Sequence, residues 1–426
     1  MTVSETDKIL IVGAGCFGIS TAYHLLKRGF TDVTILDRSE VHPAPDAAST
    51  DLNKIVRTSY SDNFYTRFAQ DAVRLWNGAI RTTSESGVLV LGSKEAPYGA
   101  KSYENDIAAG VRVTKLDTGA TISSVLPPNI KSGSLDNLAG YLNHDGGWAY
   151  ASQGISLMTE RVKEMGGKLL TGKAAHKLLR REEDGRTLGV ECKDGTRFEA
   201  ALTVLATGSW TASTFAEFDL GHCLATGQSI TTVQLTLEEA DRYRLCPVVV
   251  DFTSGFYIFP PNKDGTIKLG IHAAGYTSYA SSDTQKAIST PRTILSHGEQ
   301  GLRIPQTMVK TLRTKLRELY PELAEKPFVH TRLCWYTDTP DAHWMIGAHP
   351  SDPALVFATA GSGHAYKFLP NIGTLVADAI QGTLDEDLAK KFSPFREPDG
   401  FDLSRGPEGA KELRDEELCL PEDLLP

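Results

Sequence analysis

The segment KILIVGAGCFG near the start of the chain constrains the fold more than any other stretch. Its apolar run, Ile9–Val12, predicts a buried parallel strand, and the glycines that follow predict a turn into a helix over about residues 19–27. Gly13 permits the tight turn, Gly15 lets a pyrophosphate approach the backbone, and Gly18 lets the helix pack closely on the strand. The alternative is a glycine-rich turn that binds nothing.

A second apolar run, Val33–Leu36, predicts the next strand of the same unit, and it ends in Asp37. A carboxylate about 20 residues beyond the glycines is placed to accept hydrogen bonds from an adenosine ribose. The strand, glycine turn, helix, strand and acid together indicate a dinucleotide-binding unit. Asp37 disfavours a phosphate on that ribose, which favours FAD or NAD over NADP.

Composition limits the class of partner. The chain has 426 residues, enough for two or three domains, and a formal net charge of −9. It contains no concentrated run of lysine and arginine, so we expect neither nucleic acid nor an anionic membrane surface as a partner. A small molecule is the better expectation.

The chain also lacks the patterns that direct proteins elsewhere. No apolar run approaches the roughly 20 residues that cross a bilayer, the first residues are not a signal peptide, and the last are not Ser-Lys-Leu. We therefore expect a cytoplasmic protein. Its cysteines are scattered without metal-ligand spacing, so we expect reduced thiols and no metal site. They are Cys16, Cys192, Cys223, Cys246, Cys334 and Cys419.

Periodicity and turn residues predict the remaining elements in outline. We expect helices over residues 63–76, 152–166, 238–244 and 306–319. We also expect a strand pair around residues 87–91, two strands within residues 247–260, single strands around residues 168–170, 202–206 and 266–272, and a hairpin turn at Asp194-Gly195. The strand over residues 202–206 ends in Ala-Thr-Gly, a second turn suited to a dinucleotide. The acidic, proline-rich residues 398–426 are expected to be solvated.

Lys268 interrupts an otherwise apolar strand. Alternation places its side chain opposite Ile267 and Leu269, and a lysine in this position is usually on a solvated sheet face.

Separate motifs in one order then identify a family. The segments RLCWYTDTPDAHWMIGAHP and GSGHAYKFLPNIG, with GAGCFG, STDLNKIVR, LATGSW and TIKLGIH, resemble flavin-dependent amine oxidases. The similar enzymes are monomeric sarcosine oxidase, fructosyl amino acid oxidase (amadoriase) and pipecolate or saccharopine oxidase. The resemblance runs from about residue 8 to residue 395, so it covers nearly the whole chain.

The resemblance implies a fold of the α/β and α+β classes. A Rossmann-like FAD-binding domain would comprise residues 1–90, 147–222 and 325–395. A substrate domain built on a large mixed β-sheet would be inserted as residues 91–146 and 223–324, and a tail would follow at residues 396–426. We expect a monomer.

The resemblance also implies how the cofactor is held. Cys334 matches the cysteine that is bonded through sulfur to the flavin, whereas the alternative is an ordinary buried thiol. Lys54 is expected to contact flavin more than substrate. The full predicted FAD-binding set is Gly13, Gly15, Cys16, Phe17, Gly18, Asp37, Arg38, Ser49, Asn53, Lys54, Gly208, Cys334, Gly361, Gly363 and Lys367.

Five residues are the candidates for catalysis. Lys268 matches the lysine placed over the flavin to activate oxygen, which reverses the expectation of a solvated face. Lys367 matches the lysine that binds the substrate carboxylate, with Arg57 as its expected partner, although Arg57 could be a surface charge. His272 and Tyr336 are expected in the pocket, and His272 could equally be a core histidine.

The implied reaction is transfer of a hydride from the carbon beside a secondary amine to FAD, giving an imine, with O₂ reduced to H₂O₂. The cations would lower the pKa of the substrate amine, so the rate should rise with pH. The motifs leave sarcosine, pipecolate, saccharopine and fructosyl amino acids open as substrates. An NAD-dependent dehydrogenase and a flavin-binding protein without turnover remain alternatives.

Overall fold

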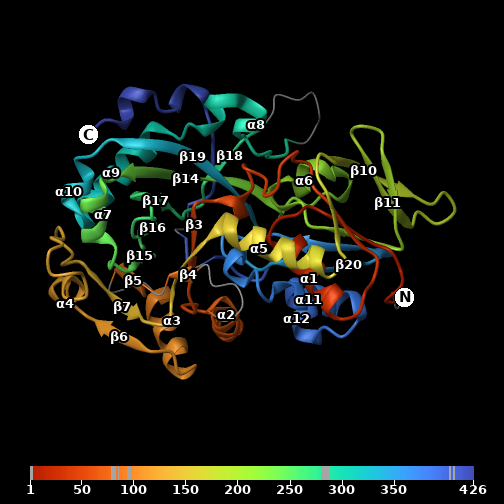
Figure 1. Cartoon of the computed structure of the whole chain (residues 1–426), viewed down its shortest axis with the longest axis horizontal. Coiled ribbons are helices and arrows are strands. Elements are labelled where there is room, and N and C mark those ends of the chain that lie inside the picture. Colours follow the sequence, from red (N-terminus) through yellow and green to blue (C-terminus); the bar gives the residue numbers. More distant parts are fainter. Residues whose placement is uncertain are drawn as a thin grey trace.

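The computed structural model of the chain describes residues 3–77, 83–84, 86–93, 97–279, 287–402, 404–405 and 408–426. Two β-sheets with separate hydrophobic cores make up most of it, one beside the other (Figure 1). The α/β and α+β class predicted from sequence is confirmed.

The first sheet has six strands in the order β20-β21-β13-β1-β2-β9. All neighbours are parallel except the edge strand β20. The order reverses between β1 and β13, and ligands of open α/β sheets bind at the carboxyl ends of the strands at such a point. The strands are β1 (Ile9–Val12), β2 (Val33–Leu36), β9 (Lys168–Leu170), β13 (Leu202–Leu205), β20 (Met345–His349) and β21 (Asp352–Thr359).

Helix α1 (Cys16–Lys27) packs between α5 (Ala151–Glu164) and α11 (Ile372–Gln381) in the core beside this sheet. It begins three residues earlier than predicted because Gly15 is already its N-cap. Gly18 therefore lies in its first turn, where a Cβ would stand 1.8 Å from the carbonyl oxygen of Gly13. Only glycine allows this approach of helix to strand.

The second sheet has ten strands in the order β22-β18-β14-β17-β16-β15-β5-β7-β6, with β19 paired to β14. The long strands β14 and β19 run side by side through the middle of the molecule (Figure 1). The strands are β5 (Val88–Ser93), β6 (Val113–Leu116), β7 (Leu138–Asn143), β14 (Leu224–Gln234), β15 (Val248–Asp251), β16 (Phe256–Ile258), β17 (Thr266–Ile271), β18 (Tyr276–Thr277), β19 (Phe328–Asp338) and β22 (Lys411–Glu412).

Two small sheets complete the strands. One comprises β10 (Ala175–Arg180), β11 (Thr187–Cys192) and β12 (Arg197–Glu199), with the predicted hairpin between its last two strands. The other comprises β3 (Asn53–Val56), β4 (Thr83–Ser84) and β8 (Gly147–Tyr150). The other helices are α2 (Asn63–Leu75), α3 (Pro97–Ala108), α4 (Gly119–Ser123), α6 (Thr211–Thr214), α7 (Leu237–Tyr243), α8 (Ile294–His297), α9 (Gln306–Leu319), α10 (Pro321–Ala324) and α12 (Glu386–Phe392).

Two strands, β5 and β19, pair across the predicted domain boundaries. Strand β19 starts inside the segment expected to bind FAD, yet it hydrogen-bonds to β14 of the large sheet. Strand β5 crosses the expected boundary after residue 90 and also belongs to the large sheet. The boundaries stay a prediction.

Two local expectations were wrong. In place of the strand pair expected around residues 87–91 there is one strand, β5, whose partners lie far along the chain, in β7 and β15. The acidic tail is not simply solvated, since the side chains of Leu418 and Cys419 are buried and Cys419 belongs to the core beside the large sheet.

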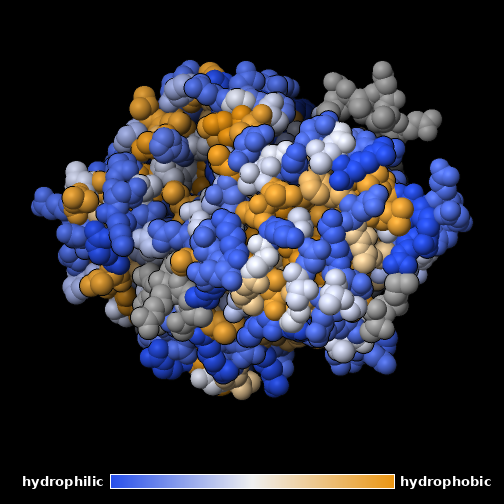
Figure 2. All heavy atoms as spheres, turned by 45° about the vertical axis from the view of Figure 1, so that its right-hand side comes forward, coloured by the Kyte–Doolittle hydropathy of each residue, from blue (hydrophilic) through white to orange (hydrophobic). Residues whose placement is uncertain are grey.

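Within the described part of the chain, no helix is both long and apolar enough to cross a bilayer. Figure 2 shows hydrophobic side chains in small groups among hydrophilic ones on the face that it presents. All six cysteines are free.

Candidate active site

A cavity of about 180 Å³ lies at the carboxyl ends of β1 and β13, where the strand order reverses. Gly13 has a φ of +108°, and a Cβ on it would lie 2.3 Å from the carbonyl oxygen of Ala206. The two predicted glycine turns are therefore neighbours across the cavity. Most of the predicted FAD-binding set lines it, namely Gly13, Gly15, Cys16, Phe17, Asp37, Arg38, Ser49, Lys54, Gly208, Gly361 and Gly363.

The ends of this cavity carry groups suited to an adenosine. The carboxylate of Asp37 is held in place by the backbone N–H groups of Ala14, at 2.8 Å, and Ser39, at 2.9 Å. The guanidinium of Arg38 lies 3.8 Å from the ring centre of Trp210. A fixed carboxylate and close backbone turns fit the adenosine diphosphate half of FAD.

The other predicted FAD-binding residues lie behind or beside this cavity. Gly18 serves the packing of α1 on β1, and Asn53 is buried with its side chain donating to Asn262. Cys334 is fully buried and lines neither cavity, whereas Lys367 lines the second one.

The second cavity, of about 510 Å³, opens from the first. Lys54, Tyr336, Gly363 and Tyr366 line both, so the two cavities meet there. All five predicted catalytic residues line this second cavity: Arg57, Lys268, His272, Tyr336 and Lys367. Folding thus brings together side chains from the end of β3, from β17 and β19, and from the turn before α11.

Lys268 is 1% exposed, so the solvated-face interpretation is wrong. Its Nζ atom lies 2.5 Å from Oδ2 of Asp51 and donates to the backbone oxygen of Asn53 at 2.8 Å. Burial lowers the pKa of Lys268 to about 8, although Asp51 opposes this shift. Burial alone would raise the pKa of Asp51, but the ammonium groups of Lys268 and Lys54 hold it well below its usual range.

Lys54 links this pair to Cys334. Its Nζ atom lies 3.0 Å from Oδ2 of Asp51 and 3.4 Å from the sulfur of Cys334. Burial opposes the charge on Lys54, but Asp51 and Cys334 more than offset it and raise the pKa. This contact places a fixed ammonium beside the sulfur of Cys334.

Arg57 and Lys367 form a buried cationic pair on another wall. The Arg57 guanidinium lies over the rings of Tyr60 and Phe252, at 4.7 and 4.9 Å, and Lys367 donates to the hydroxyl of Tyr60 at 2.8 Å. Neither cation has a carboxylate partner among the residues that the structure describes. Burial, and then Arg57, lower the pKa of Lys367 well below its usual value. An anion bound in the cavity would favour the charged form of Lys367 and would offset the repulsion between the two cations.

His272 is a cavity residue and not a core histidine. Its Nε2 atom lies 3.1 Å from the hydroxyl of Ser404, and its ring centre is 6.0 Å from that of Tyr336. Burial lowers the pKa of His272 well below its usual value, and Arg405 and Arg57 lower it further. His272 is therefore neutral near pH 7.

Some residues of the site carried no recognised signal in the sequence. Asp51 stood inside a quoted motif, but only the fold shows that it meets Lys268. Aromatic residues of the cavity, such as Tyr60 and Phe252, were not among the predicted site residues. Ser404 and Arg405 come from the segment expected to be solvated.

The site and fold together define a flavoenzyme of the oxidase type. The chain belongs to the FAD-dependent oxidoreductase family (DAO), which matches residues 8–379. Among curated proteins, it is 29% identical to L-saccharopine oxidase of Schizosaccharomyces pombe over 89% of this chain and 91% of that protein. It is 23% identical to monomeric sarcosine oxidase of Arthrobacter sp. (strain TE1826), over 91% and 96%.

Solved structures agree with these relatives. The structure of fructosyl peptide oxidase from E. terrenum has a TM-score of 0.86 at 28% identity, covering 96% of this chain and 97% of that one. Fructosamine oxidase (amadoriase II) from Aspergillus fumigatus has a TM-score of 0.82 at 26% identity, covering 94% and 91%.

Proposed function

We propose that this protein is an oxidase of a secondary amine in an amino acid. The observation that carries the proposal is the buried pair Arg57 and Lys367, which faces a cavity without a carboxylate partner in the described part of the chain. Buried like charges are costly unless an anion compensates them. A substrate carboxylate would do so and would accept charge-assisted hydrogen bonds from both.

The bound carboxylate would fix the rest of the substrate. Arg57 directly follows β3 and Lys367 precedes α11, so one anion held by both has little freedom to rotate. The amine and its neighbouring carbon would then point toward the junction of the two cavities. The cations also favour the neutral amine, the form that can donate electrons.

The glycine turns, Asp37 and Arg38 would hold FAD, which would supply a hydride acceptor and a route for two electrons to O₂ that yields H₂O₂. The substrate loses a C–H bond and an N–H proton and becomes an imine, which water hydrolyses. We propose that Lys268 stabilises negative charge on oxygen as electrons reach it, an electrostatic role that a buried, fixed cation serves well.

We further propose that Cys334 attaches the cofactor covalently through its sulfur. The support is the ammonium of Lys54, 3.4 Å from that sulfur and at the junction of the cavities. O₂ as acceptor, a monomeric state and a cytoplasmic location belong to the same proposal.

The substrate is best sought among the compounds named by the relatives. L-saccharopine oxidase and sarcosine oxidase favour an N-substituted amino acid, and the fructosyl peptide oxidase and amadoriase structures favour a fructosyl amino acid as the second candidate. A screen for H₂O₂ release across N-methyl amino acids, pipecolate, proline, saccharopine and fructosyl amino acids tests this. Activity with at least one member is expected. No release from any of them, with a flavin that no member bleaches anaerobically, would overturn the proposal.

A further inference from the structure

The segment after α12 forms one wall of the catalytic cavity. Residues 396–402, 404 and 405 are called the C-terminal strap here. Asp399, Gly400, Phe401, Asp402 and Ser404 of the strap line the cavity together with residues from β3 and β17. This is the same segment that composition marked as solvated.

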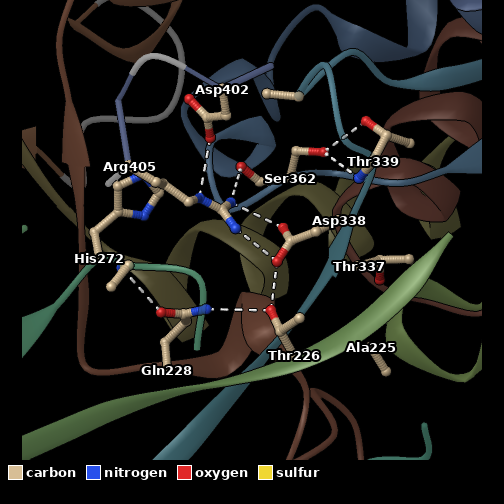
Figure 3. A network of polar contacts seen from close by, with 12 residues as sticks. Ala225, Thr226, Gln228, His272, Thr337, Asp338, Thr339, Ser362, Asp402 and Arg405 are labelled. Atoms are coloured by element: carbon tan, nitrogen blue, oxygen red, sulfur yellow. Dashed lines mark hydrogen bonds and ion pairs between the residues drawn. The ribbon is translucent and has the colours of Figure 1, made fainter. Parts of the chain in front are cut away.

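Arg405 fastens the strap to the end of β19. Its Nη1 and Nη2 atoms donate to the two carboxylate oxygens of Asp338, at 2.7 and 2.8 Å, and Nη2 also donates to the backbone oxygen of Ser362 (Figure 3). Asp338 accepts a further hydrogen bond from Thr226 of β14. The Arg405 and Asp338 side chains are 9% and 10% exposed. This bidentate pair is therefore shielded from solvent. Ion pairs interact more strongly when they are shielded in this way.

A chain of polar contacts continues from Arg405 to the cavity histidine. The Nε atom of Arg405 is ion-paired with Asp402 at 3.0 Å, and the Ser404 hydroxyl donates to the same carboxylate at 2.6 Å. His272 Nε2 lies 3.1 Å from that hydroxyl oxygen. Because the Ser404 hydrogen is used by Asp402, the hydrogen between Ser404 and His272 must come from Nε2. The strap thereby sets the tautomer of His272.

A second buried pair fastens the other end of the strap. Arg396 donates to both carboxylate oxygens of Asp341, at 2.9 and 2.7 Å, with side chains that are 9% and 0% exposed. Between the two anchors, the N–H of Asp402 donates to the backbone oxygen of Pro340 at 3.0 Å. A surface segment without secondary structure would otherwise gain entropy by leaving the cavity, so these anchors are what keep it in place.

We propose that the C-terminal strap closes the substrate cavity. In this proposal Arg405 is the positioning residue that holds the strap, and through it His272, against the end of β19. The inference rests on the proposed function, because it assigns the strap to the cavity in which the amino acid would bind. Arg405 lines neither cavity, and its contacts with the site run through Asp338, Asp402 and Ser404 and over the ring of Tyr336, 5.6 Å away.

The test compares full-length, FAD-loaded wild type with Arg405→Met by hydrogen–deuterium exchange and by steady-state kinetics. Peptides that cover the strap and residues 266–273 should exchange faster in the variant. With the amino acid that gives the highest rate in the substrate screen, KM should rise about 10-fold or more and kcat should fall less. Arg405→Lys, which keeps one charged contact, should recover part of the wild-type KM. Arg414→Met is the matched control, because Arg414 is exposed and lines neither cavity, and it should change neither measurement.

Unchanged exchange in Arg405→Met would overturn the proposal, and so would faster exchange with a wild-type KM. If Arg405→Met does not fold, Asp338→Asn/Arg405→Met removes both buried charges and serves the same comparison. Exchange is measured without substrate. A wild type that oxidises no amine would therefore defeat the proposed function, while the exchange result would still decide whether Arg405 holds the strap.

Discussion

The Nζ atom of Lys268 lies 2.5 Å from Oδ2 of Asp51, although 217 residues separate the two in the chain. Both side chains are almost completely buried, at 1% and 3% exposure. Lys54 approaches the same carboxylate oxygen at 3.0 Å. One carboxylate therefore compensates two ammonium groups at the junction of the two cavities, and it decides how much positive charge remains there.

Asp51→Asn should destabilise the fold strongly, because it leaves two buried ammonium groups without their anion. We expect a loss of about 3–5 kcal/mol in the free energy of unfolding, which is typical when one partner of a buried pair is removed. Urea denaturation followed by fluorescence measures it. Asp71→Asn, which breaks the exposed pair of Asp71 and Arg74, should change it by less than about 0.5 kcal/mol. Similar losses in both variants would contradict the role of Asp51.

Lys268→Met should slow the reaction of the reduced enzyme with O₂ far more than its reduction by substrate. Loss of one preorganised electrostatic contact costs about 10²–10³ in rate, and only the oxygen step is expected to depend on it. Stopped-flow absorbance separates the two half-reactions. Lys263→Met is the control, since Lys263 is exposed and lines neither cavity. An equal effect of Lys268→Met on both half-reactions would refute the assignment.

The two half-reactions should respond to pH with opposite signs. The ammonium form of Lys268 prevails below its pKa, which burial lowers to about 8, so the oxygen reaction should slow as pH rises through 8. The substrate amine reacts in its neutral form, so flavin reduction should speed up as pH rises. Rapid-mixing measurements from pH 6 to pH 10 check both directions. A wild-type oxygen reaction that keeps its rate above pH 8 would show that Lys268 is not the titrating cation.

Arg57→Met and Lys367→Met should each raise KM for a substrate with a free carboxylate by about 10- to 100-fold, the value of a hydrogen bond to a charged group. The corresponding amide of the same substrate is the matched control, because it lacks the anion that the two cations bind. Its KM should change much less. If acid and amide lose affinity equally, the cations support the fold and do not recognise the carboxylate.

Cys334→Ser should release the flavin on acid precipitation. Wild type should retain yellow colour in the precipitated polypeptide, whereas the variant should leave it in the supernatant. Cys223→Ser is a suitable control, since Cys223 is equally buried but lies far from Lys54 in the core beside the six-stranded sheet. Free flavin from the wild type would show that Cys334 is an ordinary thiol.

Local patterns were sufficient for much of the scaffold. The strand, glycine turn and acid from Ile9 to Asp37 predicted the dinucleotide unit, because each step depends on residues close in sequence. The same holds for α9, whose amphipathic period ends before Pro321. The catalytic candidates were found differently, through motifs whose order resembles a family, and all five line one cavity.

What these patterns could not predict depends on contacts between distant segments. A lysine on an alternating strand has the same sequence whether its face is solvated or buried, and only the approach of Asp51 explains why Lys268 is tolerated inside. Likewise, an acidic, proline-rich segment is typical of solvated chain. Its composition therefore did not predict that residues 399–402 and 404 line the cavity.

The sequence by itself thus predicted a site for an adenosine dinucleotide at Gly13 and Gly15, because the residues that form such a site are close together in the chain. Only the tertiary structure decided which charges share the cavity and which segment covers it. The reason is physical: ion pairs such as Arg405 with Asp338 act over a few ångströms of space, and spatial neighbours far apart in the chain leave no local pattern.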